Sequence, residues 1–116
     1  MTGRVQFAVG SSARHTVVAA SGTIYVDTCG ALRETLLMLA ADEEPRIVLD
    51  LSGVDVCDSS GLNLMEQTHL MATRHGGWLR VAGVQSIVWK LLDATHLTRV
   101  LQLYETAEQA AANANT

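Results

Sequence analysis

A nearly uninterrupted apolar run at residues 46–51 constrains the fold of this chain more than any other feature of its sequence. A run of this length without alternation is typical of a central strand that is covered on both faces, as in parallel sheets. Shortly after it the chain reads Asp-Ser-Ser-Gly-Leu at residues 58–62, and a segment with helical spacing follows. The sequence therefore predicts a strand-to-helix junction inside an α/β domain.

The serine pair at this junction is a candidate modification site. Serine hydroxyls at the start of a helix lie near free backbone N–H groups and the positive end of the helix dipole. Such a place tolerates an added phosphate better than most of a protein surface. The alternative is that one serine only caps the helix, and Ser60, reaching toward the N–H of Asn63, is then the better candidate. Asp58 is the other possible cap.

Composition limits the partners that this chain can have. Its 116 residues are 48% apolar and only 4% aromatic, which indicates one domain over residues 1–116 with an aliphatic core and a frayed tail at residues 113–116. Eight Lys and Arg against twelve Asp and Glu give a net charge of −4, which argues against a nucleic-acid groove. No apolar run approaches the ~20 residues that span a bilayer, and no signal peptide is evident. We therefore expect a cytoplasmic protein with no nucleic-acid or membrane partner.

Periodicity and turn residues indicate strands and helices in the order β-β-α-β-α-β-α-β-α. The expected strands are residues 5–9, 15–20 with an extension at 23–26, 46–51, 78–82 and 100–103. The expected helices run from Thr28 to about Ala41, from Gly61 to about His75, onward from Ser86, and onward from Thr106. Residues 52–55 are interpreted as a loop. A hairpin followed by alternating strands and helices predicts a mixed sheet with helices packed on it.

The helix ends and faces carry more specific expectations. Asp27 or Thr28 is expected to cap the first helix, Gly76 to stop the second, Ser86 to cap the third, and Thr106 to open a capping box. The inward residues of the second and third helices are Leu64, Met65, Thr68, Met71 and Ala72, and then Ile87, Val88, Leu91 and Leu92. Leu62 falls toward a different side of the second helix and is expected to stay partly exposed. Both tryptophans, Trp78 and Trp89, are interpreted as packing residues.

Enzyme and metal chemistry find little support in the sequence. A serine hydrolase needs a Gly-x-Ser-x-Gly elbow and a positioned histidine, and neither is evident. His69 and His75 do not share a helix face at metal-binding spacing. The cysteines, Cys29 and Cys57, are too few and too far apart for a zinc site or a disulfide framework, so we interpret them as reduced, half-buried residues. We expect no enzymatic activity, no cofactor and no metal.

The junction and the order of elements together resemble the STAS-domain anti-sigma factor antagonists of bacteria. The resemblance covers nearly the whole chain and rests on four segments. They are Ile-Val-Leu-Asp-Leu at 47–51, Asp-Ser-Ser-Gly-Leu at 58–62, Val-Ala-Gly-Val at 81–84 and Thr-Ala-Glu-Gln-Ala at 106–110. The junction segment is fairly specific, and the others gain weight from their order. The resemblance implies a single STAS-like domain.

For function, the resemblance implies partner switching in bacterial signalling. In that family the unphosphorylated protein binds an anti-sigma factor that is also a serine kinase, and this frees a sigma factor for transcription. The kinase then phosphorylates the serine directly after the aspartate, here Ser59, and the complex dissociates. A metal-dependent serine phosphatase resets the switch. The chain would then be a phosphoprotein, a monomer or weak dimer, with Asp58, Ser60 and Gly61 supporting the switch.

The chain departs from the family pattern near the expected partner surface. The family usually has an acidic residue after the glycine that ends the second strand and an aspartate two residues later, whereas Gly22 is followed here by Thr23 and Tyr25. Together with Leu62 and Asn63, these two residues are the expected partner contacts. The alternative function is a STAS-like scaffold, or a small-anion-binding module in a signalling assembly, that is not phosphorylated.

Overall fold

The computed structural model describes residues 5–12 and 14–112, so the expected frayed tail at residues 113–116 lies outside the described residues. Within them, five strands form one sheet in the order β1-β2-β3-β4-β5. The strands are β1 (Gln6–Ser11), β2 (Thr16–Ile24), β3 (Arg46–Cys57), β4 (Trp78–Ala82) and β5 (Gln102–Tyr104). β1 pairs antiparallel with β2, and the other three pairings are parallel. The mixed sheet predicted from the sequence is confirmed.

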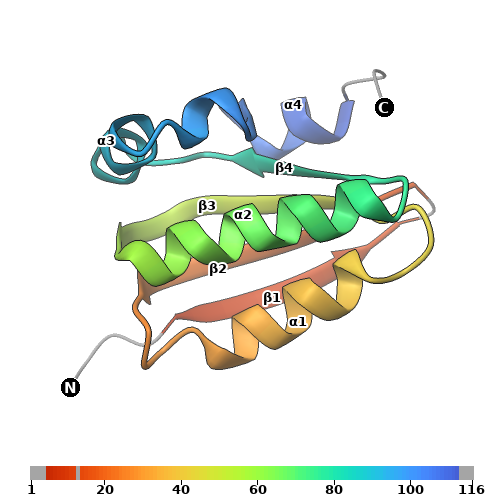
Figure 1. Cartoon of the computed structure of the whole chain (residues 1–116), viewed down its shortest axis with the longest axis horizontal. Coiled ribbons are helices and arrows are strands. Elements are labelled where there is room, and N and C mark those ends of the chain that lie inside the picture. Colours follow the sequence, from red (N-terminus) through yellow and green to blue (C-terminus); the bar gives the residue numbers. More distant parts are fainter. Residues whose placement is uncertain (1–4, 13, 113–116) are drawn as a thin grey trace.

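Among the residues described, three of the four helices lie in the connections between parallel strands, and the fourth follows the last strand. They are α1 (Gly30–Ala40), α2 (Ser59–Arg74), α3 (Ser86–Ala94) and α4 (Ala107–Ala112), and a short 3₁₀ helix, η1 (Leu97–Arg99), precedes β5. α1 and α2 lie side by side across one face of the sheet (Figure 1). In the part of the chain that the structure describes, no helix is both long and apolar enough to cross a membrane. The predicted order of elements is confirmed, with η1 as an addition.

The central strand is covered on both faces, as its apolar run predicts. Ile47 and Leu49 point into the main core, where they meet α1, α2 and the buried stripe of α3. Val48, between them in sequence, points to the opposite face and belongs to a smaller cluster with Ala110 of α4. Because successive side chains of a strand point to opposite faces, an apolar stretch without alternation buries both of its sides.

β3 is longer than the sequence predicts. The expected loop at residues 52–55 is wrong, because the strand continues through Cys57. β2 runs parallel to it as far as Ile24 and supplies backbone partners along the extension, with two register irregularities on the way. Gly53 fits this contact, since a Cβ there would lie 2.7 Å from the Cβ of Ser21. The extension brings the end of β3 beside the end of β2, where the serine junction begins.

Two predicted helix signals are confirmed. Gly76 follows the last residues of α2 with φ of 82°, the left-handed conformation that favours glycine after a helix. The backbone N–H of Gln109 donates to the hydroxyl oxygen of Thr106 at 3.1 Å, so Thr106 caps α4 as expected. Both signals depend only on local backbone chemistry, which is why the sequence suffices to find them.

Two predicted caps are wrong. α1 begins after Cys29, which makes no side-chain cap, and the hydroxyl of Thr28 instead accepts from the N–H of Tyr25 at 2.9 Å. Thr28 therefore closes the turn before α1 rather than capping the helix. Ser86 is the first residue of α3 and follows an N-cap, Gln85, that makes no side-chain capping bond.

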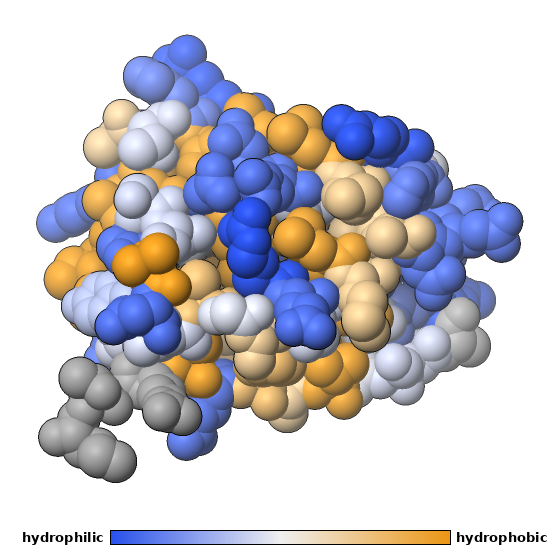
Figure 2. All heavy atoms as spheres, turned by 60° about the horizontal axis from the view of Figure 1, so that its bottom comes forward, coloured by the Kyte–Doolittle hydropathy of each residue, from blue (hydrophilic) through white to orange (hydrophobic). Residues whose placement is uncertain are grey.

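α3 buries a narrower stripe than expected. Val88 and Leu92 are buried, but Ile87 is 62% and Trp89 45% exposed, so the inward placement of Ile87 and the packing role of Trp89 are wrong. In this helix of nine residues, only two positions four residues apart, Val88 and Leu92, are fully buried in the core. Trp78, on a strand, is buried as predicted. Figure 2 shows the molecule turned by 60° so that the bottom of Figure 1 comes forward. On that face, hydrophobic side chains are interspersed with hydrophilic ones.

Arg80 in the middle of β4 is fully buried beneath α4. Its guanidinium lies 3.7 Å from the ring centroid of Trp78 and 5.9 Å from that of Tyr104. Its Nη1 donates to the carbonyl oxygen of Ala110 at 2.9 Å. Stacking and hydrogen bonding together compensate for removing this charge from water, and they hold α4 against the second face of the sheet.

We expect Arg80→Met to lower the free energy of unfolding by about 2–4 kcal/mol, because it breaks a buried network and leaves the Ala110 carbonyl without this donor. The exposed Arg74→Met is the control and should change the free energy by less than about 0.5 kcal/mol. Urea denaturation measures both. Equal, small effects for the two variants would contradict this role for Arg80.

Candidate functional site

The serine junction is organised by the side chain of Asp58. This residue is the N-cap of α2, with extended backbone angles, and its Oδ1 accepts from the backbone N–H of Ser60 at 2.9 Å. Its Oδ2 accepts from the N–H of Val26, in the loop after β2, at 3.4 Å. The expectation that Ser60 caps the helix by reaching Asn63 is therefore wrong, and the alternative, Asp58, is correct. Asp58 wins because its side chain precedes the first helical residue, the position from which an oxygen reaches the orphan N–H groups.

Ser59, the first residue of α2, has an exposed side chain, whereas Ser60 behind it is half-buried. Within residues 5–12 and 14–112, the Ser59 hydroxyl takes part in no hydrogen bond. Because Asp58 already satisfies the Ser60 N–H, neither serine side chain is required as the cap. The Ser59 hydroxyl is thus free, accessible and placed at the mouth of a sixteen-residue helix.

Gly61 lets the first turn of α2 lie directly on the sheet. It is buried, and a Cβ built there would lie 3.1 Å from the Cβ of Cys57 and 3.2 Å from Cγ2 of Ile24. Such contacts are tighter than side chains normally make, so a larger residue would push the helix away from the strand ends. Gly61 is therefore required for the close packing of α2 on the strand ends.

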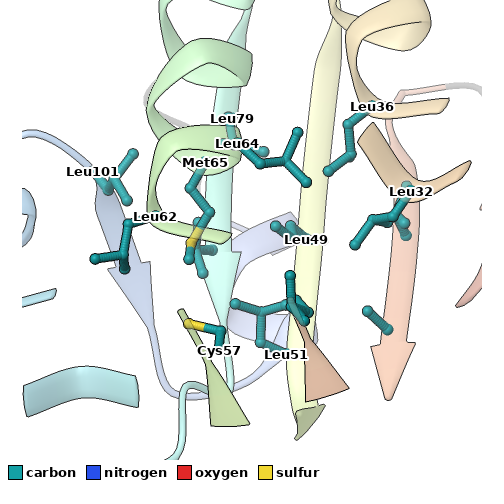
Figure 3. Close-up of a cluster of buried hydrophobic side chains, with 14 of the residues drawn as sticks. Leu32, Leu36, Leu49, Leu51, Cys57, Leu62, Leu64, Met65, Leu79 and Leu101 are labelled. Carbon is teal, nitrogen blue, oxygen red and sulfur yellow. The ribbon is translucent and has the colours of Figure 1, made fainter. Parts of the chain in front are cut away.

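Leu62 does not stay partly exposed, so that expectation is wrong. Its side chain is only 6% exposed and belongs to the main core together with Leu97 and Leu101. In Figure 3 it extends from α2 on the side of the helix where Leu101 lies. The segment that follows α3 covers this side of α2, which the spacing within α2 alone cannot reveal. Leu62 offers a partner almost no side-chain surface.

Cys57 lies beneath the junction, and its thiol is unreactive at neutral pH. Burial, and secondarily the neighbouring Asp58 carboxylate, raise the pKa of its thiol from 9.0 to about 11. The thiol therefore stays protonated at neutral pH and is a poor nucleophile. Since the folded state prefers the protonated form, this contribution to stability is complete below pH 9 and is lost as the pH rises toward 11. Cys29 is buried as well, so both cysteines are more buried than expected.

The loop between β2 and α1 lies beside the junction. Its turn is held by Thr28, whose hydroxyl donates to the carbonyl of Thr23 at 3.1 Å. Tyr25 is 40% and Val26 73% exposed, whereas Thr23 is half-buried. The structure therefore brings Tyr25 to the same edge of the sheet as Ser59.

Two residues of this edge were not found from the sequence. A hollow beside Ser59 is lined by Val26, Cys29, Gly30, Arg33, Ser59, Ser60 and Asn63. Val26 and Arg33 come from the loop and from α1, and only the packing of α1 against α2 places them here. A lone arginine on an amphipathic helix gives no signal in the sequence of such a placement. Among the described residues, no group of three or more His, Cys, Asp or Glu could hold a metal ion.

We expect Asp58→Ala to lower the free energy of unfolding by about 1 kcal/mol, the usual cost of losing an N-cap. Ser60→Ala should stay within about 0.5 kcal/mol, because its N–H rather than its hydroxyl makes the capping bond. Asp58→Asn keeps an acceptor oxygen and is the matched control, which should recover most of the loss. Chemical denaturation of the three variants decides between the two caps, and a larger loss for Ser60→Ala would contradict the assignment.

Comparison with solved structures places the whole arrangement among known domains. An anti-sigma factor antagonist from Mycobacterium paratuberculosis is 27% identical, with a TM-score of 0.82 over 94% of this chain and 95% of that one. The phosphorylated form of the Bacillus cell fate determinant SpoIIAA is 16% identical, with a TM-score of 0.69 over 90% and 96%. A sulfate transporter family protein from Wolinella succinogenes is 18% identical, with a TM-score of 0.68 over 83% and 80%. The two latter likenesses establish the fold only.

The scan of protein families agrees with the fold and with the resemblance noted in the sequence. The model that matches is described as the STAS domain, and it spans residues 6–110, from the first strand to the last helix. The anti-sigma factor antagonists of this family are regulators rather than enzymes. On this match, the chain belongs to the STAS domain family.

Proposed function

We propose that this protein is a cytoplasmic anti-sigma factor antagonist that works by partner switching. In its unphosphorylated form it binds an anti-sigma factor with serine kinase activity, and the sigma factor is released for transcription. The kinase transfers the γ-phosphoryl group of ATP to Oγ of Ser59, the hydroxyl proton is lost, and ADP leaves. The phosphorylated protein dissociates, and a metal-dependent serine phosphatase restores the hydroxyl.

One observation carries the proposal: the Ser59 hydroxyl is exposed at the start of α2, while its neighbours hold the backbone of the junction in place. A kinase reaches such a hydroxyl without local unfolding. The likeness to the mycobacterial antagonist, at 27% identity over 94% of this chain, supports the same reading. Ser60, half-buried behind it, is the poorer acceptor.

The free energies explain why a phosphate at this position would act on a complex and not on the fold. Phosphorylation adds a charge of about −1.5 to −2. In the free domain, water solvates this charge, and the positive end of α2 stabilises it by ~0.3–1 kcal/mol. The negative charge of Asp58 partly offsets that stabilisation. When a partner is docked, water is excluded from the phosphate. An unpaired buried charge then costs the complex ~3–4 kcal/mol of binding free energy. Since each ~1.4 kcal/mol is a factor of ten, that penalty separates a sub-micromolar complex.

The partner surface that we propose is centred on the exposed groups around Ser59. Tyr25 offers an exposed ring beside the junction, and Asn63 lies one helical turn after Ser59 and is exposed. Thr23 contributes less, because it is half-buried, and Leu62 contributes least. Because Leu62 is buried, the apolar part of this surface comes instead from Tyr25, which is 40% exposed, and from Val26, which is 73% exposed.

A second candidate is a STAS-like scaffold or small-anion-binding module that is never phosphorylated. The observation that favours it is the absence of carboxylates at positions 23 and 25, where relatives of this type usually carry them. The fold itself does not decide, because a sulfate transporter family protein shares it. The two candidates differ in whether a charge at Ser59 alters the interaction with the native partner.

We expect Ser59→Asp to weaken binding to the anti-sigma factor at least tenfold, because it adds a negative charge where the complex excludes water. Ser59→Ala should bind like the wild type and should remain bound after ATP is added. Thr73→Asp, about 21 Å further along the axis of α2, is the charge-matched control and should bind normally. Isothermal titration calorimetry provides the affinities. Unchanged binding of Ser59→Asp would contradict the electrostatic switch and favour the scaffold.

A further inference from the structure

Among the described residues that line the hollow beside Ser59, Arg33 has the one charged side chain. It belongs to α1, is half-buried, and comes from a helix that packs against α2. The other lining groups are neutral and include a hydroxyl, an amide and a glycine backbone. Arg33 therefore brings a positive charge to a hollow that it shares with the candidate phosphate acceptor, and no carboxylate stands among the described residues that line it.

The present partner of Arg33 is a neutral one. Its Nη2 donates to Oε1 of Gln67 on α2, across the interface between the two helices. Ser59, Asn63 and Gln67 follow each other at intervals of four residues, so they share one face of α2. The Arg33 guanidinium therefore contacts the third residue of this row, Gln67, and the Ser59 hydroxyl is at the other end, at the start of α2.

A phosphate on Ser59 would be a stronger acceptor than the Gln67 amide. Charge-assisted hydrogen bonds are roughly twice as strong as neutral ones, and the planar guanidinium matches phosphate geometry with two parallel donors. The carboxylate of Asp58, beside Ser59, accepts from the backbone N–H groups of Ser60 and Val26. It therefore does not hold Arg33 in place, and the guanidinium is able to exchange one partner for the other.

We propose that Arg33 is the internal receptor for the phosphate on Ser59. On modification the guanidinium leaves Gln67, moves along the shared face of α2 and pairs with the phosphate in the hollow. The inference rests on the proposed modification of Ser59 and adds its consequence. The phosphate is retained on the protein's own surface, and the hollow that is open in the unmodified protein is filled.

The pairing has two effects on the switch. It offsets part of the added charge, so the phosphate does not strain the junction next to Asp58. It also shields the phosphate from attack by a phosphatase, so the released state persists longer than an unprotected phosphoserine would. Arg33 is thus a positioning residue for the modified state and has no role in the chemistry of phosphoryl transfer.

The test uses full-length protein with phosphoserine installed at position 59 during synthesis, so that no kinase is needed. Nuclear magnetic resonance of the arginine side chains should show the Arg33 Nε–Hε signal shifted on phosphorylation, while that of Arg74, at the far end of α2, stays unchanged. Treatment with a non-specific phosphatase should remove the phosphate about fivefold faster from Arg33→Gln than from the otherwise wild-type protein. Arg33→Lys, which keeps the charge but loses the fork, should fall between them, and Arg74→Gln should match the wild type.

An Arg33 signal that is identical in both forms, together with equal dephosphorylation rates, would overturn the inference. The Arg33 Nε–Hε signal is measured in the protein without any arginine substitution. A variant that fails to fold therefore cannot explain away a negative result. The experiment also separates a failure of this inference from a failure of the proposed function. If the native anti-sigma factor does not phosphorylate Ser59 but the installed phosphate shifts the Arg33 signal, partner switching fails while the pairing of Arg33 with the phosphate stands.

Discussion

The carboxylate of Asp58 holds together the part of this protein on which its function depends. One oxygen satisfies the Ser60 N–H at the start of α2, and the other accepts from Val26 in the loop after β2. The backbone N–H of Asp58 donates to the carbonyl of Ile24 at 3.1 Å, which joins the ends of β2 and β3 as well. Because Asp58 makes these three hydrogen bonds, the hydroxyl of the serine that follows it is not needed to cap α2 or to hold the junction. An aspartate rather than a serine at the cap is what makes Ser59 available.

The layer beneath the junction explains why so small a change at its surface can act without a change of shape. Gly61 brings the helix within contact distance of Cys57, and Leu62 closes the core beside it. Protein interiors are packed as densely as organic crystals, so the core beneath the junction has little room to rearrange when Ser59 is modified. A charge added above it must therefore be accommodated locally, by water, by the helix end or by Arg33. Partner release then follows from local electrostatics.

The sequence predicts the parts of this fold that depend on local chemistry and on the apolar pattern. The residues of the central strand, the glycine stop of α2 and the Thr106 cap each carry their signal within a few positions of the chain. It fails where a distant segment decides the outcome. β3 continues past Leu51 because β2 runs beside it, and Leu62 is buried because the segment after α3 covers it. Trp89 is exposed for the opposite reason, since no element covers that side of α3 among the described residues.

The candidate site divides in the same way. Asp58 and Ser59 are adjacent in the sequence, which indicates both, although it favours Ser60 over Asp58 as the cap. Arg33 is 26 residues before Ser59 and reaches the site only through helix packing, so nothing in the pattern of α1 marks it. Sites assembled from one turn of chain can be read from a sequence, whereas their second partners require the fold.

The most direct test of the account is to map the phosphate after incubation with the native anti-sigma factor and ATP. Mass spectrometry of the digested protein should find a single modification, on Ser59, with Ser60 unmodified although it is the next residue. Phosphate on Ser60, or no phosphate at all with an active kinase that binds the protein, would contradict the claim that the freed hydroxyl is the switch.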